Sequence, residues 1–177
     1  MKNKKVATKM LFTFGVTLVL SLAMIGVSIR TILSVRSNYE SILSNQVKMT
    51  EAVLESGMEV NSIARQLRDM ALFGYDSSTM DSIQDSINTI DADTNTIDTL
   101  YTGTDGMAQQ YINEVKDWES TFTDIDQALQ ANDSARVAQL IQNQCTPKLN
   151  QAVSTGQSLI AQLTSQSNQL TDQAESS

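Results

Sequence analysis

The run of residues 10–29 is mostly apolar, contains no charged side chain and ends at Arg30. At about 1.5 Å per residue, a helix over this run spans about 30 Å, which is the thickness of the hydrocarbon core of a bilayer. An amphipathic pattern continues beyond Arg30 without a break. We therefore expect a transmembrane helix over residues 10–30 that continues directly into a helical domain.

A cleaved signal peptide is the alternative for this run, because a charged start followed by an apolar segment fits both. Signal peptides have an apolar core of about 7–15 residues, followed by a cleavage site between small residues. Here the run is longer, and Arg30 and Arg36 follow it, which favours an uncleaved anchor. Lysines crowd residues 1–9, so the positive-inside bias predicts a cytoplasmic N-terminus and an extracytoplasmic domain over residues 31–177.

The charge of the outer part excludes several classes of function. All 20 acidic residues lie at or beyond Glu40, and only six basic residues follow residue 37, which gives this part a formal charge of −14. Nucleic-acid binding requires a basic patch, so we expect no nucleic-acid partner. The chain has no His and one Cys, Cys145, so it lacks the commonest metal ligand and catalytic base and any intrachain disulfide. We expect no enzyme activity, no metal site and no cofactor.

Apolar residues after the run recur at steps of three and four residues in four stretches, which is the spacing of amphipathic helices. Residues 73–76, 102–106 and 132–134 interrupt the pattern. The first and fourth stretches, residues 37–73 and 134–175, extend about 55–60 Å, against about 40 Å for the other two. The sequence therefore predicts an all-α fold, an antiparallel up-down four-helix bundle in which long helices 1 and 4 frame a shorter helix 2/3 hairpin.

Local signals refine this prediction. Residues 78–81 predict an N-terminal box in which the hydroxyl of Ser78 caps the second helix. Trp118 and Phe122 lie on the most regular stripe of the chain, which favours core packing over an aromatic ligand box. Cys145 is expected to be buried. The Asp-rich run of the second helix lacks a Gly-centred loop, so a solvated helical face is favoured over a calcium site.

The first helix has a second apolar stripe beside its core stripe. A four-helix monomer offers this stripe no partner, so we expect it to meet its own copy across a two-fold axis, as a homodimer through helix 1. The residues of this second stripe are Leu43, Val47, Leu54, Met58 and Ala71.

Three segments, together with the lysine-rich start and the span, resemble the N-terminal part of a bacterial methyl-accepting chemotaxis protein with a four-helix-bundle sensor. They are Val60-Asn61-Ser62-Ile63-Ala64-Arg65-Gln66-Leu67-Arg68, Asn132-Asp133-Ser134-Ala135 and Gln144-Cys145-Thr146-Pro147-Lys148-Leu149. The resemblance implies a ligand-sensing input region of a chemoreceptor, a homodimer along helix 1, a second span, a HAMP relay and a cytoplasmic signalling hairpin. The last three are absent from these residues, so we expect the front portion of a longer receptor.

Two alternatives to a chemoreceptor stay open at this point. Sensor histidine kinases and cyclases use similar input bundles, so the output is inferred from the resemblance alone. A membrane-anchored helical stalk without a ligand needs only the apolar heptads. A half-height band of basic residues on helices 1, 3 and 4 favours a receptor, because a spacer does not require it.

The resemblance also implies a ligand site. In the aspartate and serine receptors of this family, helix-one arginines bind the ligand carboxylate and helix-four groups bind the amino end. Carried onto this chain, the ligand-binding positions are Arg65 and Arg68 in helix 1 and Asn143, Gln144, Thr146 and Lys148 in helix 4.

The chain departs from the family pattern at two places. Ala71-Leu72-Phe73 stands where a third arginine is usual, and Lys148 stands where a hydroxyl is usual. An amino acid and a simple organic acid are therefore both candidate ligands. A purely structural role is the alternative for the arginines, because Arg65 and Arg68 could pair with Asp69 or with acids of the second helix.

Overall fold

The computed structural model describes the backbone of residues 2–175 and the side chains of residues 24–173, except residues 32, 34–36 and 38. The described chain is all-helical, as the apolar periodicity predicts. Its elements are α1 (Lys2–Phe73), α2 (Ser77–Leu100), α3 (Met107–Glu119), α4 (Phe122–Gln130), α5 (Ser134–Leu140), the π-helix η1 (Ile141–Cys145) and α6 (Thr146–Glu175).

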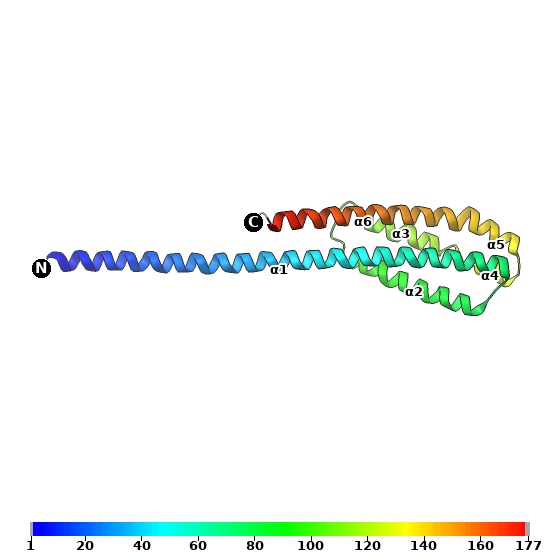
Figure 1. Ribbon diagram of the computed structural model, residues 1–177, viewed down its shortest axis with the longest axis horizontal. Helices are drawn as coiled ribbons and strands as arrows, with labels where there is room; N and C mark the ends of the chain where they lie inside the picture. Colours follow the sequence, from blue (N-terminus) through cyan, green and yellow to red (C-terminus); the bar gives the residue numbers. More distant parts are fainter. Residues whose placement is uncertain (1, 176–177) are drawn as a thin grey trace.

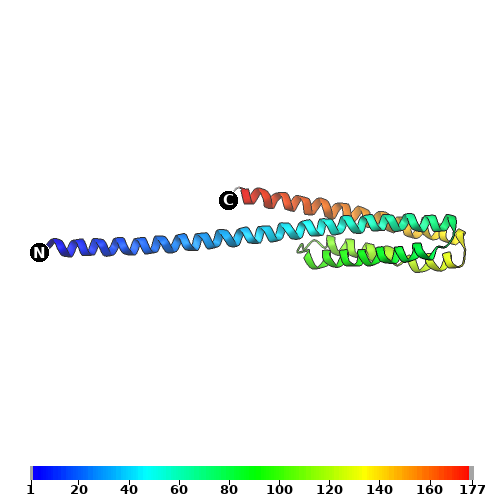
Figure 2. The ribbon, with the colours of Figure 1, turned by 60° about the horizontal axis from the view of Figure 1, so that its bottom comes forward.

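The helices form an antiparallel bundle (Figure 1). The chain runs out along α1, returns along α2, runs out again through α3 and α4, and returns through α5, η1 and α6. α1 packs against α2 and α6, and α3 packs against the same two helices. Figure 2 shows that α1 and α6 extend past the α2–α3 turn, with α1 extending furthest. The long first and last helices thus frame a shorter hairpin.

The predicted membrane span is not tested by the described side chains. Among the described residues, no helix is long and apolar enough to cross a membrane. Residues 10–23 make up most of the predicted span, and their side chains lie outside the described residues. The span over residues 10–30 therefore stays a prediction.

One core joins the four helical segments. Ile63 of α1, Ile90 of α2, Trp118 of α3 and Leu159 of α6 are all fully buried. The ring of Trp118 packs edge-on against Phe122, with ring centroids 4.6 Å apart. The prediction that these aromatic residues pack in the core is confirmed, and Cys145 is buried as expected.

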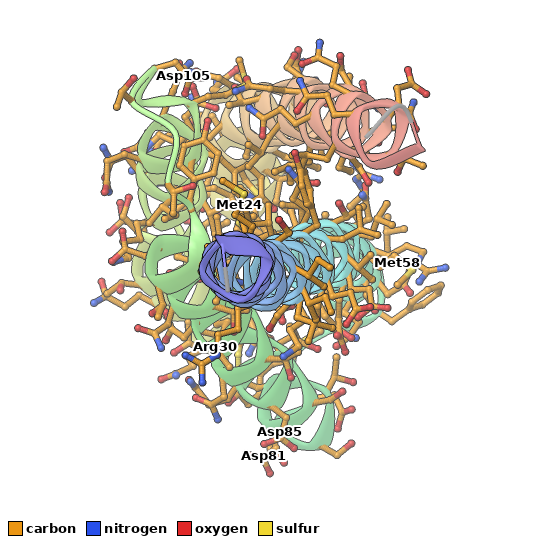
Figure 3. All side chains as sticks on the ribbon, turned by 90° about the vertical axis from the view of Figure 1, so that its left-hand side faces the viewer. Met24, Arg30, Met58, Asp81, Asp85 and Asp105 are labelled. Carbon is orange, nitrogen blue, oxygen red and sulfur yellow. The ribbon has the colours of Figure 1, made fainter. Side chains whose placement is uncertain are left out.

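Most of the second stripe of α1 stays outside this core, whereas Ala71, which the sequence pattern assigns to this stripe, packs against the core. Val47 and Leu54 are each 50% exposed and Met58 is 66% exposed. Figure 3 shows Met58 projecting from α1 away from the other helices, and Asp81 and Asp85 projecting from the outer side of α2. The prediction that the second stripe has no partner within one chain is confirmed for these three residues.

The helix ends follow from local hydrogen bonding. α1 ends at Phe73, and Gly74 adopts a left-handed conformation with φ of 103°. The carboxylate of Asp76 accepts hydrogen bonds from the amides of Ser78 and Thr79, and hydrogen bonds from these two residues lower the pKa of Asp76 to about 2. The prediction that Ser78 caps α2 is therefore wrong, because a carboxylate that accepts several hydrogen bonds displaces a hydroxyl in this role.

The third and fourth segments are not continuous α-helices. The hydroxyl of Thr121 donates to the carbonyl of Trp118 at 2.7 Å, three residues earlier, and this local bond accompanies the break between α3 and α4. In the fourth segment, the amide of Thr146 bonds to the carbonyl of Ile141 in a π-turn. Pro147 has no N–H group and crowds the preceding turn, which explains why the wider turn forms there.

Candidate functional site

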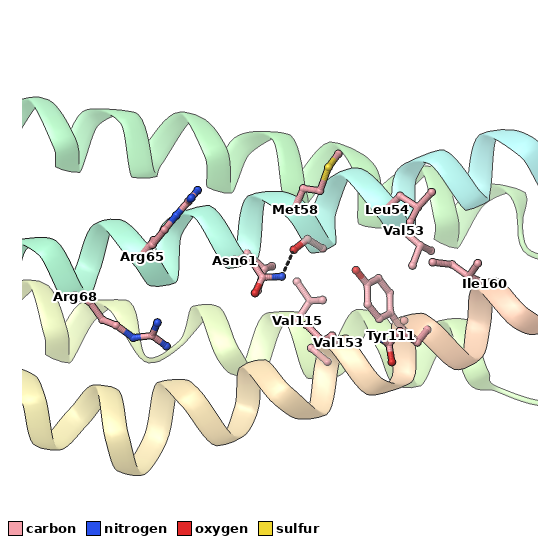
Figure 4. Close-up of a pocket in the computed structure, with 15 residues that line it drawn as sticks. Val53, Leu54, Met58, Asn61, Arg65, Arg68, Tyr111, Val115, Val153 and Ile160 are labelled. Carbon is pink, nitrogen blue, oxygen red and sulfur yellow. Dashed lines mark hydrogen bonds between the residues drawn. The ribbon is translucent and has the colours of Figure 1, made fainter.

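A groove of about 710 Å³ lies between α1 and α6, with α3 at its floor (Figure 4). It begins near the middle of the bundle and ends at two arginines. We call it the α1–α6 groove. Its walls and floor are formed by Val53, Leu54, Gly57, Met58, Val60, Asn61, Arg65, Arg68, Tyr111, Val115, Ala152, Val153, Gly156, Gln157 and Ile160.

The floor of the groove is closely packed around Tyr111. The Tyr111 hydroxyl and the Ser56 hydroxyl lie 2.6 Å apart, and both residues are buried. Because Ser56 donates its proton to the carbonyl of Ala52 at 2.7 Å, the Tyr111 hydroxyl donates to Ser56. Burial raises the pKa of Tyr111, and the bond to Ser56 partly opposes this rise. A Cβ at Gly156 would lie 2.9 Å from the Tyr111 ring, so only glycine lets α6 approach this closely.

The walls of the groove are apolar, and one gap opens between them. Leu54 and Met58 of α1 are half-exposed or more, and Val153 and Ile160 of α6 are partly buried. A Cβ at Gly57 would meet no atom within 4 Å. The missing side chain of Gly57 therefore leaves open space in the groove, whereas the missing side chain of Gly156 permits contact.

Arg65 and Arg68 lie at the end of the groove that is further from the chain termini. In Figure 4, Arg68 extends from α1 toward α6, and Arg65 extends toward the other side of α1. Along the helix axis, both side chains lean toward the N-terminus of α1, as helical side chains do, and the groove extends in that direction. Neither arginine forms a hydrogen bond or an ion pair with any described residue. The alternative pairing with Asp69 or with acids of α2 is therefore not present in the described part of the chain.

The four predicted residues of the fourth helical segment do not line the groove. Asn143 and Gln144 are exposed in η1, and Thr146 is half-buried at the start of α6. The Lys148 ammonium bonds to the Asp117 carboxylate of α3 at 2.8 Å. These residues lie near the level of Arg68, which acts electrostatically on Cys145 of η1, but none of them belongs to the lining of the groove.

Residues further along α6 take their place in the groove, namely Ala152, Val153, Gly156, Gln157 and Ile160. Two physical effects explain the difference. A π-turn holds an extra residue, so η1 changes which residues of the fourth segment face α1. The arginine side chains also lean back along α1, toward residues of α6 beyond Lys148. The sequence offers one signal for these positions, because Gly57 and Gly156 interrupt helical patterns at a cost of about 1 kcal/mol relative to alanine.

Two carboxyl groups with raised pKa values, Asp93 and Glu119, do not line the groove. Burial, with repulsion from Glu55 and Glu59 of α1, raises the pKa of Asp93 to about 6. One carboxylate oxygen of Asp93 is buried without a hydrogen-bond partner. Burial, with repulsion from Asp91, raises the pKa of Glu119 to about 7.

Other reactive groups offer no second site in the described residues. No group of three or more Cys, Asp or Glu side chains there is arranged to hold a metal ion. Burial raises the pKa of the Cys145 thiol. A buried thiol with a raised pKa is a poor nucleophile. The α1–α6 groove is therefore the candidate site.

Comparison of this chain with models of protein families, with curated proteins and with solved structures finds no match. The described structure is an all-helical, bundle-like domain. Its function must therefore be argued from its own residues and from the motifs they form.

Proposed function

We propose that this chain is the extracytoplasmic ligand-sensing input region of a membrane-anchored chemoreceptor. Residues 10–30 form the anchor in this proposal, residues 1–9 lie in the cytoplasm, and the four-helix bundle outside binds a small organic acid or amino acid. The observation that carries the proposal is the pair of arginines Arg65 and Arg68 at one end of the α1–α6 groove, which form no ion pair with any residue that the structure describes.

The electrostatics of the groove support a carboxylate ligand. Acids outnumber basic residues by 14 in this part of the chain, yet the groove lining contains two arginines and no Asp or Glu. A guanidinium group without a protein partner can donate two parallel hydrogen bonds to a carboxylate. Arg68 is the principal candidate because it extends toward α6 (Figure 4), and Arg65 would contribute from the rim.

A homodimer through α1 is part of the same proposal. Leu54 and Met58 belong to the second stripe and also form one wall of the groove. A second chain packed on this stripe would bury its apolar side chains and would also cover the open side of the groove. A ligand in the groove would then contact both the α1–α6 interface and the interface between chains.

The mechanism we propose is a shift of population between two registers of α6 against α1. A ligand that contacts both helices stabilises the register in which its contacts are better, and it can shift the equilibrium only by that difference in affinity. Helix displacements of about 1–2 Å are typical of such transitions. α1 carries the predicted span, so a change of register at this interface would reach the membrane.

Two alternative functions make different predictions. The input region of a histidine kinase or cyclase would use the same groove and the same register change, so it shares every test of ligand binding. A helical stalk without a ligand would bind no small molecule. The open groove, and two arginines that pair with no residue in the described part of the chain, favour a receptor over a stalk.

Calorimetry on the full chain in lipid nanodiscs tests the ligand proposal. The titrants are small organic acids, amino acids and matched uncharged amides. Loss of one charge-assisted hydrogen bond costs about 1.5–3 kcal/mol, so we expect Arg68→Ala to weaken binding of an acid about tenfold to a hundredfold. Arg68→Lys should weaken it nearly as much, because lysine lacks the planar fork. Arg65→Ala should have a smaller effect.

Arg136→Ala is the matched control, because Arg136 is an exposed arginine of α5 outside the groove. It should leave binding unchanged, and none of these variants should alter the thermal unfolding of the chain. If the Arg65→Ala/Arg68→Ala double variant bound acids as well as the natural chain, the carboxylate site would be wrong.

Cysteine cross-linking in membranes tests the homodimer. Cysteines introduced at Val47 or Leu54 should form disulfides between chains, because both lie on the second stripe. A cysteine at Asp85, on the outer side of α2 (Figure 3), should not. Equal cross-linking at Val47 and Asp85 would remove α1 as the interface.

A further inference from the structure

We infer that the α1–α6 groove selects carboxylates that carry an apolar body and lack an ammonium group. This inference rests on the proposed function, because it assumes that Arg65 and Arg68 receive the carboxylate. It narrows the ligand from amino acids and organic acids in general to one chemical class.

The groove offers no charged partner to the ammonium group of an amino acid. The groove lining contains no Asp or Glu to pair with it. The uncharged polar groups are few and partly engaged, because the Tyr111 hydroxyl bonds to Ser56 and the Asn61 amide donates to the carbonyl of Gly57 at 2.7 Å. An ammonium group in the groove would lose hydration without gaining an opposite charge, which weakens binding. A carboxylate alone has a charged partner here.

The apolar walls of the groove favour a ligand that carries an apolar body. Leu54 and Met58 on one side face Val153 and Ile160 on the other, and Gly57 leaves a gap between them. The volume of about 710 Å³ lies within the range of ligand sites, about 300–1,000 Å³. A small dicarboxylate would leave these walls in water. An apolar body would cover them, and each buried methylene group strengthens binding about fourfold.

The positions of the charged and apolar parts fix the orientation of the ligand. The arginines lie at one end of the groove, and the apolar side chains and Gly57 lie toward the other (Figure 4). Because the arginine side chains lean toward the N-terminus of α1, the carboxylate is expected at the level of Asn61. The apolar body would then extend past Gly57 toward Leu54 and Ile160.

The test is calorimetric titration of the full chain in lipid nanodiscs, with empty nanodiscs as the correction for partitioning. The probes are 3-phenylpropanoate, its 2-amino counterpart phenylalanine, its neutral amide 3-phenylpropanamide, and succinate. We expect 3-phenylpropanoate to bind at least about tenfold more tightly than each of the other three probes. Phenylalanine adds an ammonium group without a charged partner, the amide lacks the carboxylate, and succinate lacks the apolar body.

Two leucine substitutions test whether the ligand occupies the gap at Gly57. Gly57→Leu fills the groove without a clash, so it should weaken binding of 3-phenylpropanoate at least about tenfold while the chain stays folded. Ser158→Leu is the matched control, because it adds the same side chain at an exposed position of α6 outside the groove.

The outcomes separate this inference from the proposed function. If phenylalanine or succinate bound as tightly as 3-phenylpropanoate, and Arg68→Ala abolished that binding, the inference would be overturned and the carboxylate site would stand. If the neutral amide bound as tightly as the acid, both would fail. If no probe bound and a cysteine at Gly57 cross-linked to its own copy, a second chain would occupy the groove, which would also overturn the inference.

Discussion

The two interfaces of α6 differ in what holds them together. Polar contacts join α6 to α3 and to the α2–α3 turn. Lys148 bonds to Asp117 of α3 at 2.8 Å, Gln151 bonds to Glu114 of α3 at 3.0 Å, and Gln162 bonds to Tyr101 of the turn at 3.0 Å. Gln162 also bonds to Asp105 in the α2–α3 turn. These bonds fix the register of α6 against the hairpin.

Against α1, the same helix packs without such bonds over most of its described length. No hydrogen bond or ion pair joins α1 to α6 among the described residues from 42 to 170. The α1–α6 groove of about 710 Å³ and a second groove of about 240 Å³ near Gln46 and Thr164 interrupt this interface. At Gly156 the three helices come close together, because a Cβ there would lie 2.9 Å from Tyr111 of α3 and 3.3 Å from Val53 of α1.

This difference indicates which parts of the bundle move together. Apolar contacts can exchange neighbours at little cost, whereas a hydrogen-bonded pair must break before it can shift. We therefore expect α6 and the α2–α3 turn to move as one body against α1. The register change proposed for signalling would then take place at the α1–α6 interface, where the groove lies.

The largest expected effect comes from Gly156 of α6, whose closest neighbour is the Tyr111 ring of α3 and whose next is Val53 of α1. Gly156→Leu would place a side chain against the Tyr111 ring, and we expect the free energy of unfolding to fall by about 1–3 kcal/mol or more. Chemical denaturation of the full chain in detergent measures this. Gly57→Leu is the matched substitution in open space, and it should leave stability unchanged or slightly raised. Equal losses for both variants would remove the contrast between the two glycines.

Asp93 is a partly buried carboxyl group of α2 that lies near Glu55 and Glu59 of α1, at the α1–α2 interface. The pKa of Asp93, about 6, lies above its ordinary value of 3.8, so the folded chain binds this proton more tightly than the unfolded chain does. The free energy of unfolding should therefore fall as the pH rises from about 4 to about 6 and then level off. Asp93→Asn should remove this part of the decline and stabilise the chain at pH 7 by about 1 kcal/mol, a figure reduced for solvent screening.

Denaturation across this pH range measures the effect, with Asp85→Asn on the outer side of α2 as the control for lost charge. Glu119, with a pKa raised to about 7, should preserve part of the pH dependence in the Asp93→Asn variant. An Asp93→Asn variant with the same profile as the natural chain would show that repulsion from Glu55 and Glu59 does not weaken the α1–α2 interface.

Gln162 tests the stronger interface. Gln162→Leu removes the bonds to Tyr101 and Asp105 while keeping the approximate size of the side chain. Because the net free energy that each hydrogen bond contributes is modest, we expect the amides of the α2–α3 turn to exchange about twofold to tenfold faster in this variant. Hydrogen exchange followed by mass spectrometry measures this. Ala161 is exposed at the preceding position of α6, so Ala161→Leu serves as the neighbouring control. Unchanged exchange in Gln162→Leu would mean that these bonds do not hold the turn.

The smallest effect is expected at Lys148. Its partner Asp117 is 61% exposed, and exposed ion pairs contribute about 0.2–1 kcal/mol and weaken with salt. Lys148→Met should therefore lower the free energy of unfolding by this amount at low salt and by less at about 1 M salt. A loss independent of salt would mean that the side chain stabilises the chain by packing alone.

Apolar periodicity predicts the segments of this fold well, because burial of one face is what the pattern records. Val60, Ile63 and Trp118 lie in the core as their spacing predicts. The break after Phe73 and the cap at Asp133 also follow from local residues. The π-turn before Pro147 and the break at Thr121 do not, because they depend on local hydrogen bonds that leave the apolar spacing almost unchanged.

The candidate site is harder to predict than the fold. Arg65 and Arg68 can be selected from the sequence because free basic residues are rare on so acidic a domain. The opposing residues of the groove, such as Val153 and Gly156, depend on the phase of the fourth segment after η1. A small change of phase moves a side chain to another face of the helix, and the resemblance that selects Asn143 and Thr146 contains no information on this change.

The most direct test of the account measures the two interfaces of α6 in one experiment. Spin labels at the exposed positions Glu51 of α1 and Ser165 of α6 report the α1–α6 distance. Labels at the exposed positions Asn113 of α3 and Ser154 of α6 report the α3–α6 distance. Cys145 is buried and does not compete for the spin label. On addition of 3-phenylpropanoate to the full chain in nanodiscs, we predict that the α1–α6 distance changes by about 1–2 Å while the α3–α6 distance stays constant. A change at α3–α6 with a constant α1–α6 distance would contradict the account.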